Sequence, residues 1–210
     1  MTKETFSQCV AGCCSVIESI RQSAHQLHAD VNQHYDGDKP YGFHLDMVAS
    51  SVFDYGHEVC ADECDLLPLF FGAYYHDSIE DARLTYNDVR RQALLWMDER
   101  QALMASEIVY ALTNDKGRTR QERAGDHYYS GIRETPYAPF VKLADRLANT
   151  RYSFRESDQA NTRMRDVYRE EMSHFLQAIT VDAAIAAADC RFSLPKEMLQ
   201  DIARLLAAHL

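Results

Sequence analysis

The stretch "FFGAYYHDSIEDARL" (residues 70–84) joins an apolar, aromatic run directly to a dense group of ionisable side chains. The run begins as a buried helix would, but His76, Asp77, Glu80 and Asp81 can all bind a cation or move a proton. Since each residue of a helix advances about 100° around its axis, a continuing helix would place these four side chains on one face. Burying unpaired carboxylates is very costly, so a divalent cation is the natural compensation. The stretch therefore predicts a helix that carries a metal or proton-transfer site.

The composition predicts a folded protein with a substantial core. The chain has 210 residues, of which 46% are hydrophobic, a length and composition that suit one large domain. Its net charge of −10 and pI near 5.3 argue against nucleic-acid or anionic-membrane partners, which need a positive face. No apolar segment is long enough to cross a bilayer, and the N-terminus lacks signal-peptide features. We expect a cytoplasmic protein, and the sequence leaves homo-oligomer formation open.

The six cysteines offer a weaker signal. Cys9 and Cys13 are four residues apart, as are Cys60 and Cys64, so each pair would share a helical face. A zinc or redox site is one interpretation. Such sites are more often marked by tighter CxxC spacing, so we favour small, buried, reduced thiols.

Helical periodicity dominates the chain, and no segment shows convincing strand alternation. Pro and Gly are few and fall mostly between the helical segments. We predict one all-α domain over residues 1–210, a helical bundle of about ten helices. The segments expected to be helical are 5–35 (as one long or two short helices), 43–55, 63–82, 85–94, 101–113, 119–132, 138–154, 162–179, 181–190 and 195–210.

Partners for the acidic cluster are expected elsewhere in the chain. His44 follows a Pro-Tyr turn in "KPYGFHL" (39–45), and Asp145 and Asn149 lie four apart in "VKLADRLANTRYSF" (141–154). Taken alone, His44 is more often a histidine at a helix end, and Asp145 more often pairs with a neighbouring arginine on the surface. Together with His76 and Asp77 they would form a set of two imidazoles and two carboxylates, which suits manganese, iron or zinc.

The order of these residues resembles that of the HD-domain metal-dependent phosphohydrolases. "HDSIED" (76–81) is similar to the "HDxxED" of the alarmone hydrolases, the RelA/SpoT type and its small stand-alone relatives. "KPYGFHL" is similar to their "PYxxH", "VKLADRLANTR" to their "KLADRLxNxR", and "TNDKGRTRQER" (113–123) to a segment with an Asp-Lys pair. The resemblance spans roughly residues 20–180, and the combination of motifs is specific.

The resemblance implies an HD-type helical fold and a role for each matching residue. Glu80 and Asp81 would orient and deprotonate the attacking water. The ion would be a divalent metal, manganese first, with iron, zinc or magnesium as alternatives. The implied metal ligands are His44, His76, Asp77 and Asp145, and the implied contacts to substrate phosphate, ribose or base are Lys116, Asn149, Arg151 and Tyr168.

The implied substrate is a small-molecule nucleotide, and the implied reaction removes the 3′-pyrophosphate from guanosine tetra- or pentaphosphate. One departure bears on this substrate. The alarmone enzymes carry an Arg/Lys-rich stretch before "PYxxH", whereas here "AHQLHADVNQHYDGDKPY" (24–41) holds Lys39 as its only basic residue besides histidine. Two alternatives stay open: a nucleotide phosphatase acting on 5′-monophosphates or a phosphorylated dinucleotide, and a non-catalytic nucleotide-binding HD domain. Glu80 and Asp81 count against the second, because a pure binder needs no water-activating pair.

Overall fold

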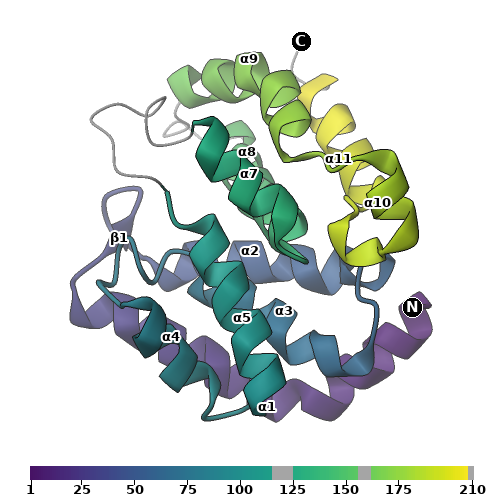
Figure 1. Ribbon diagram of the computed structural model, residues 1–210. Helices are drawn as coiled ribbons and strands as arrows, with labels where there is room; N and C mark the ends of the chain where they lie inside the picture. The colour runs from purple at the N-terminus through teal and green to yellow at the C-terminus, as the bar shows by residue number, and fades with distance from the viewer. Residues whose placement is uncertain (115–124, 156–161, 208–210) are drawn as a thin grey trace.

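The computed structural model describes residues 1–114, 125–155 and 162–207. This part of the chain forms a bundle of ten α-helices, a two-stranded hairpin and three short 3₁₀ helices (Figure 1). The predicted all-α fold is confirmed, and no described helix is long and apolar enough to span a membrane. The helices are α1 (Lys3–Asp30), α2 (Gly42–Tyr55), α3 (Leu66–Tyr75), α4 (Tyr86–Ala93), α5 (Glu99–Leu112), α7 (Asp126–Glu134), α8 (Ala138–Phe154), α9 (Thr162–Ile179), α10 (Ala183–Ala188) and α11 (Lys196–Ala207), with η1 (Gly56–Glu58), η2 (Glu63–Asp65) and η3 (Cys190–Phe192).

Helix α3 lies at the centre of the bundle. Its aromatic residues Phe70, Phe71, Tyr74 and Tyr75 are all buried, and α1, α2, α5 and α8 pack around it. A helix that is apolar on every side is stable only when it is covered on every side. Figure 1 shows α1 and α4 on one side of the bundle and α9 to α11 on the other. Helix α3 is therefore the centre of the hydrophobic core.

The predicted continuation of this helix through residues 76–81 is wrong. Helix α3 ends at Tyr75, and the ionisable residues lie in the turns that follow. The Ser78 amide donates to the Tyr75 carbonyl (2.9 Å), and Arg83 adopts a positive φ of 62° that redirects the chain. In the turns, Glu80 is exposed and Asp77 and Asp81 are partly exposed, so these carboxylates avoid the cost of burial without a partner.

The segment predicted to be helical over 5–35 is also shorter than expected. Helix α1 ends at Asp30, and the chain then forms β1 (His34–Tyr35) and β2 (Lys39–Pro40), an antiparallel hairpin that the sequence did not predict. Asp36 and Gly37 both have positive φ, at 49° and 87°, at the turn. Asp and Gly tolerate this conformation better than most residues, so the Asp-Gly pair is the signal that was missed.

Helix α8 has the bounds predicted for it, residues 138–154. Tyr137 precedes it with a φ of 67°, is fully buried, and donates its hydroxyl proton to Asp65 (2.7 Å). The start of α8 is thereby fixed against the start of α3. Helix α8, which carries Asp145, therefore has a fixed position relative to α3, which leads into His76. Helix α2, which carries His44, packs against both.

Candidate metal centre

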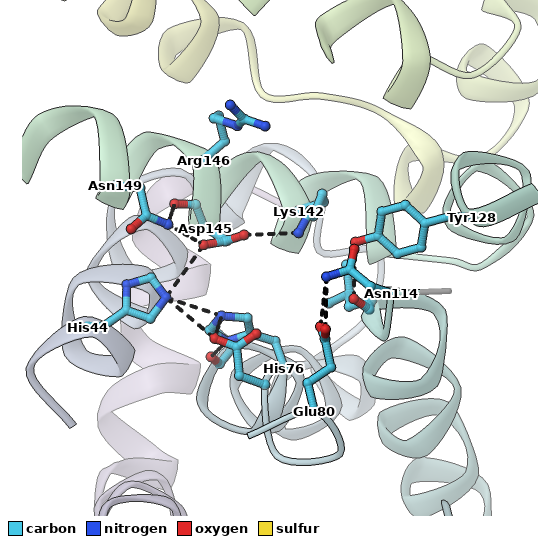
Figure 2. A network of polar contacts seen from close by, with 12 residues as sticks. His44, His76, Glu80, Asn114, Tyr128, Lys142, Asp145, Arg146 and Asn149 are labelled. Carbon is cyan, nitrogen blue, oxygen red and sulfur yellow. Dashed lines mark hydrogen bonds and ion pairs between the residues drawn. The ribbon is translucent and has the colours of Figure 1, made fainter. Parts of the chain in front are cut away.

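Three helices bring His44, His76 and Asp145 together. His44 lies in the first turn of α2, His76 directly follows α3, and Asp145 lies midway along α8. One ligand atom from each lies within 4.8 Å of the others, and both imidazoles are only 2% exposed. Figure 2 shows the three side chains pointing toward one another. The structure therefore assembles three of the four predicted ligands around a common point.

Asp77, the fourth predicted ligand, lies against both histidines. Its Oδ2 is 2.9 Å from Nε2 of His76 and 3.7 Å from Nε2 of His44. The hydroxyl of Tyr41 donates to the same oxygen. All four predicted ligands thus belong to one cluster, in which the Asp77 carboxylate faces the Nε2 atoms of both imidazoles.

The two imidazoles have different surroundings. Nδ1 of His76 lies 2.9 Å from the carbonyl oxygen of Ala73, which can only accept, so Nδ1 carries a proton and Nε2 is the nitrogen left to bind a second proton or a metal. This hydrogen bond is the usual way in which a metal-binding histidine is oriented. Nδ1 of His44, in contrast, is buried and has no hydrogen-bond partner among the described residues. The ring of His44 must be held by packing instead.

Asp145 is held by two residues of its own helix. Lys142 Nζ lies 3.1 Å from Oδ2, and Asn149 Nδ2 donates to Oδ1 at 2.6 Å. The same Oδ1 is 3.4 Å from Nε2 of His44. Figure 2 shows Lys142 and Asn149 on either side of the carboxylate, while Arg146 points away from the cluster. The spacing i−3 and i+4 places all three side chains on one helical face.

The charged groups of the cluster shift one another's pKa values. Burial lowers the pKa of His76, but the carboxylates of Asp77 and Asp145 raise it to about 9. Burial raises the pKa of Asp145, but Lys142 and the two histidines hold it well below its usual range. His76 also holds the pKa of Asp77 below its usual range, against the effect of burial. The carboxylates are ionised at neutral pH, and a cation is favoured between them.

This donor set fits a divalent ion. Ionised carboxylates and imidazole nitrogens are ligands for zinc, manganese and iron, and binding would displace the proton from His76. A second group of metal-ligand side chains comprises His57, Glu58 and Glu197, but Glu58 there already accepts from the backbone of Lys196 (2.8 Å) and Glu197 (3.1 Å) at the start of α11. Neither group contains a cysteine in the described part of the chain.

Glu80 and Asp81, the predicted water-activating pair, follow in the turn after His76. Asn114 Nδ2 donates to both carboxylate oxygens of Glu80, at 2.8 and 3.1 Å, and Glu80 is exposed. Asp81 is half-buried, and burial together with the negative charge of Asp77 raises its pKa above the usual value. Figure 2 shows Glu80 beside the His76 turn, with its carboxylate directed at Asn114. The two carboxylates therefore differ in solvation, and only one is held by an amide.

The predicted substrate contacts do not all lie at the cluster. Lys116 lies outside the described residues. Asn149 is at the cluster, where its amide is bound to Asp145. Tyr168, on α9, reaches the neighbouring part of α8, with its ring centre 5.1 Å from the guanidinium carbon of Arg146. The roles of these three residues toward a substrate stay predictions.

Arg151 is not brought to the cluster. Six residues after Asp145, it is rotated by about 240° around α8. Its guanidinium donates to the hydroxyl of Tyr55 (2.7 Å) and lies 3.7 Å from Asp201 of α11. Tyr55 ends α2, about 16 Å along that helix from His44. Arg151 thus links α8 to α2 and α11, where it contributes to packing of the bundle.

Aromatic side chains form a wall beside the ligands. The ring of Tyr35 stacks on His44, with ring centres 5.1 Å apart and an interplanar angle of 10°. Tyr152 lies edge-on to Tyr35 (4.9 Å), and Phe43, the residue before His44, is 5.8 Å from Tyr152 and 39% exposed. Arg155 lies over the ring of Tyr152, 3.4 Å from its centre. Sequence reasoning missed this wall, because its members come from three separate segments.

A cavity of about 500 Å³ is lined by the C-terminal part of α1, the hairpin and the start of α2, and it shares Tyr41 with the site. Among the described residues, its polar lining is made of amides, imidazoles and the Tyr41 phenol, with neither lysine nor arginine. Most of the lining residues belong to the stretch 24–41, which corresponds to the segment in which the alarmone hydrolases carry basic residues. The lining residues are Gln22, His25, Gln26, Ala29, Asn32, Gln33, His34, Pro40, Tyr41 and Gly42.

The chain matches no protein-family model, and no curated protein is similar enough to it to match.

Proposed function

We propose that this protein is a metal-dependent phosphohydrolase that acts on a nucleotide. The observation that carries the proposal is the convergence of His44, His76 and Asp145 from three helices, with Asp77 against both imidazoles. Buried carboxylates need a positive partner; Lys142 and protonated His76 supply it in the metal-free cluster, and a divalent cation would take the place of the His76 proton. The motifs around these residues resemble those of HD-domain phosphohydrolases, which supports phosphoester hydrolysis as the reaction.

The four clustered residues would hold the ion, with manganese the first choice and iron, zinc or magnesium as alternatives. When bound, such an ion lowers the pKa of a coordinated water toward about 7 and polarises a phosphoryl oxygen. Lys142 stays charged beside Asp145, since Tyr128 and Asp145 raise its pKa against the effect of burial. It therefore occupies Oδ2 of Asp145, while Oδ1 faces His44 and accepts from Asn149.

Glu80 and Asp81 are the proposed proton acceptors for the attacking water. A carboxylate whose pKa is raised is a better base and can later return the proton to the leaving group. The raised pKa of Asp81 supports this role. Glu80, held at both oxygens by Asn114, is suited to orient the water, because its own position is fixed.

A nucleotide substrate is supported by the aromatic wall. Phe43 is exposed and precedes a proposed ligand, so a base stacked on it would place the sugar phosphates near the metal. Base–aromatic stacking contributes about 1–3 kcal/mol per base. The resemblance to alarmone hydrolases supports guanosine tetra- or pentaphosphate as the substrate, with the 3′-pyrophosphate as the group removed.

The cavity beside the hairpin favours a second candidate. The described residues of its lining include none of the basic side chains that would hold additional phosphates. A substrate with fewer charges, a nucleoside 5′-monophosphate or a phosphorylated dinucleotide, needs fewer such contacts. In this candidate the metal centre is the same and the product is orthophosphate.

The two candidates are separated by their products. Purified protein loaded with Mn²⁺, and in parallel with Fe²⁺, Zn²⁺ or Mg²⁺, is incubated with guanosine 3′,5′-bis(diphosphate), with guanosine 5′-diphosphate as the matched control lacking the 3′ group, and with 5′-monophosphates and a phosphorylated dinucleotide. The leading proposal predicts pyrophosphate from the first compound alone. Orthophosphate released only from 5′-monophosphates or a phosphorylated dinucleotide would replace it with the second candidate. No hydrolysis of any nucleotide with any of the four metals would contradict both.

A further inference from the structure

The hairpin of β1 and β2 docks along one face of α8. Tyr35 donates to Asn149 (2.9 Å), and Asp36 accepts from the hydroxyl of Tyr152 and lies 3.6 Å from Arg155. Asn149 and Tyr152 of α8 and Arg155, which directly follows its last residue, come at intervals of three residues, so they form a stripe. Asp145 stands four residues before the first of them and belongs to the same stripe. The hairpin therefore covers the face of α8 that presents Asp145.

The hydrogen bonds from Tyr35 to Asp145 have a fixed direction. A carboxylate can only accept, so the amide of Asn149 must turn its Nδ2 toward Asp145. Its oxygen then faces the hydroxyl of Tyr35, which must donate. The phenol proton thus fixes the amide, and the amide fixes the carboxylate.

The ring of the same tyrosine reaches a second ligand. His44 lacks the hydrogen bond at Nδ1 that ordinarily orients a metal-binding imidazole, and the ring of Tyr35 stacks on it almost parallel. Tyr41 contacts the imidazole edge-on, with ring centres 5.4 Å apart. Packing on Tyr35 and Tyr41 therefore replaces the missing hydrogen bond.

From these contacts we infer that Tyr35 is a positioning residue of the metal centre, which orients Asp145 through Asn149 and orients His44 through its ring. The inference rests on the proposed metal site. It gives the hairpin, in the segment that departs from the alarmone hydrolases, a role in metal binding. The two contacts come from separate parts of one side chain, so they can be removed one at a time.

The test measures Mn²⁺ affinity by calorimetry in the full-length protein. Tyr35→Phe removes the hydroxyl and keeps the ring, and we expect it to weaken binding about tenfold, the lower end of the usual effect of an outer-shell partner. Tyr35→Leu removes both and should weaken binding further, toward about 100-fold. Tyr152→Phe is the matched control, because it removes a phenol bond to the same hairpin without touching a proposed ligand, and should leave the Mn²⁺ affinity unchanged.

A double-mutant cycle tests the path through Asn149. If Tyr35 acts through the amide, Tyr35→Phe should have no further effect in an Asn149→Ala background. Equal effects of Tyr35→Phe and Tyr152→Phe, or an unchanged affinity in Tyr35→Phe, would overturn the inference while the metal centre stands. A wild-type protein that binds no Mn²⁺ would overturn the metal centre and the inference together.

Discussion

The Nε2 atoms of His44 and His76 lie 3.3 Å apart, and both rings are buried. Because the other nitrogen of His76 donates to the Ala73 carbonyl, its Nε2 needs either a proton or a metal when it faces carboxylates. Protonation and metal binding therefore compete for Nε2 of His76, and either one stabilises the buried carboxylates beside it.

The metal-free protein should lose stability as the pH rises. The pKa of His76 is raised to about 9, above the value of about 6.5 for an unfolded histidine. A raised folded-state pKa contributes stability that is fully present below pH 6.5 and lost as the pH passes 9. The shift corresponds to about 3 kcal/mol. Denaturant unfolding of metal-free protein between pH 6 and 9.5 measures it, and His76→Gln should flatten the profile; an equal slope in that variant would contradict the assignment.

Glu80→Gln should separate ligation from catalysis. Glu80 is assigned to the water, so the metal content should not change, while turnover should fall by about 10²-fold or more, the usual scale for a lost proton acceptor. Metal analysis and steady-state kinetics on the same preparation give both values. Unchanged turnover would leave Glu80 with a structural role only, through its bond to Asn114.

The exposed aromatic ring before His44 should matter for substrate binding. Phe43→Leu removes the stacking surface and should raise KM about tenfold with a smaller change in kcat, since stacking is largely ground-state binding. Phe53 is similarly exposed (43%) on the same helix but lines a separate cavity. Phe53→Leu is therefore the matched control. A similar KM for both variants would contradict stacking of the substrate base on Phe43.

Two glycines should respond oppositely to alanine. A Cβ on Gly72 of α3 would lie 2.6 Å from Cγ2 of Ile108, so Gly72→Ala should destabilise by about 1–3 kcal/mol through overpacking. A Cβ on Gly131 of α7 would meet nothing within 4 Å, so Gly131→Ala should stabilise by about 0.5–1 kcal/mol. Thermal unfolding of both variants tests whether α3 is packed as closely as described, and a neutral Gly72→Ala would show that it is not.

The helices and the candidate ligands could be predicted because local signals mark them. The bounds of α8 follow from its periodicity, and the spacing of Asp145 and Asn149 places both on one face. The end of α3 could not be predicted, because the polar residues after Tyr75 keep helical spacing, so the sequence pattern does not mark where the helix stops. Tyr35 was missed for a different reason: no sequence rule links a hairpin residue to an amide on a helix 114 positions further on.

The central claim is that hydrolysis depends on a metal held by this cluster. The most direct measurement compares nucleotide hydrolysis by the purified protein, by the same protein stripped with a chelator, and by the stripped protein reloaded with Mn²⁺, with Asp145→Asn carried through in parallel. We predict that stripping abolishes turnover, that Mn²⁺ restores it, and that Asp145→Asn neither retains the metal nor recovers activity. Full activity in the stripped wild-type protein, or equal metal content and turnover in Asp145→Asn, would contradict the account.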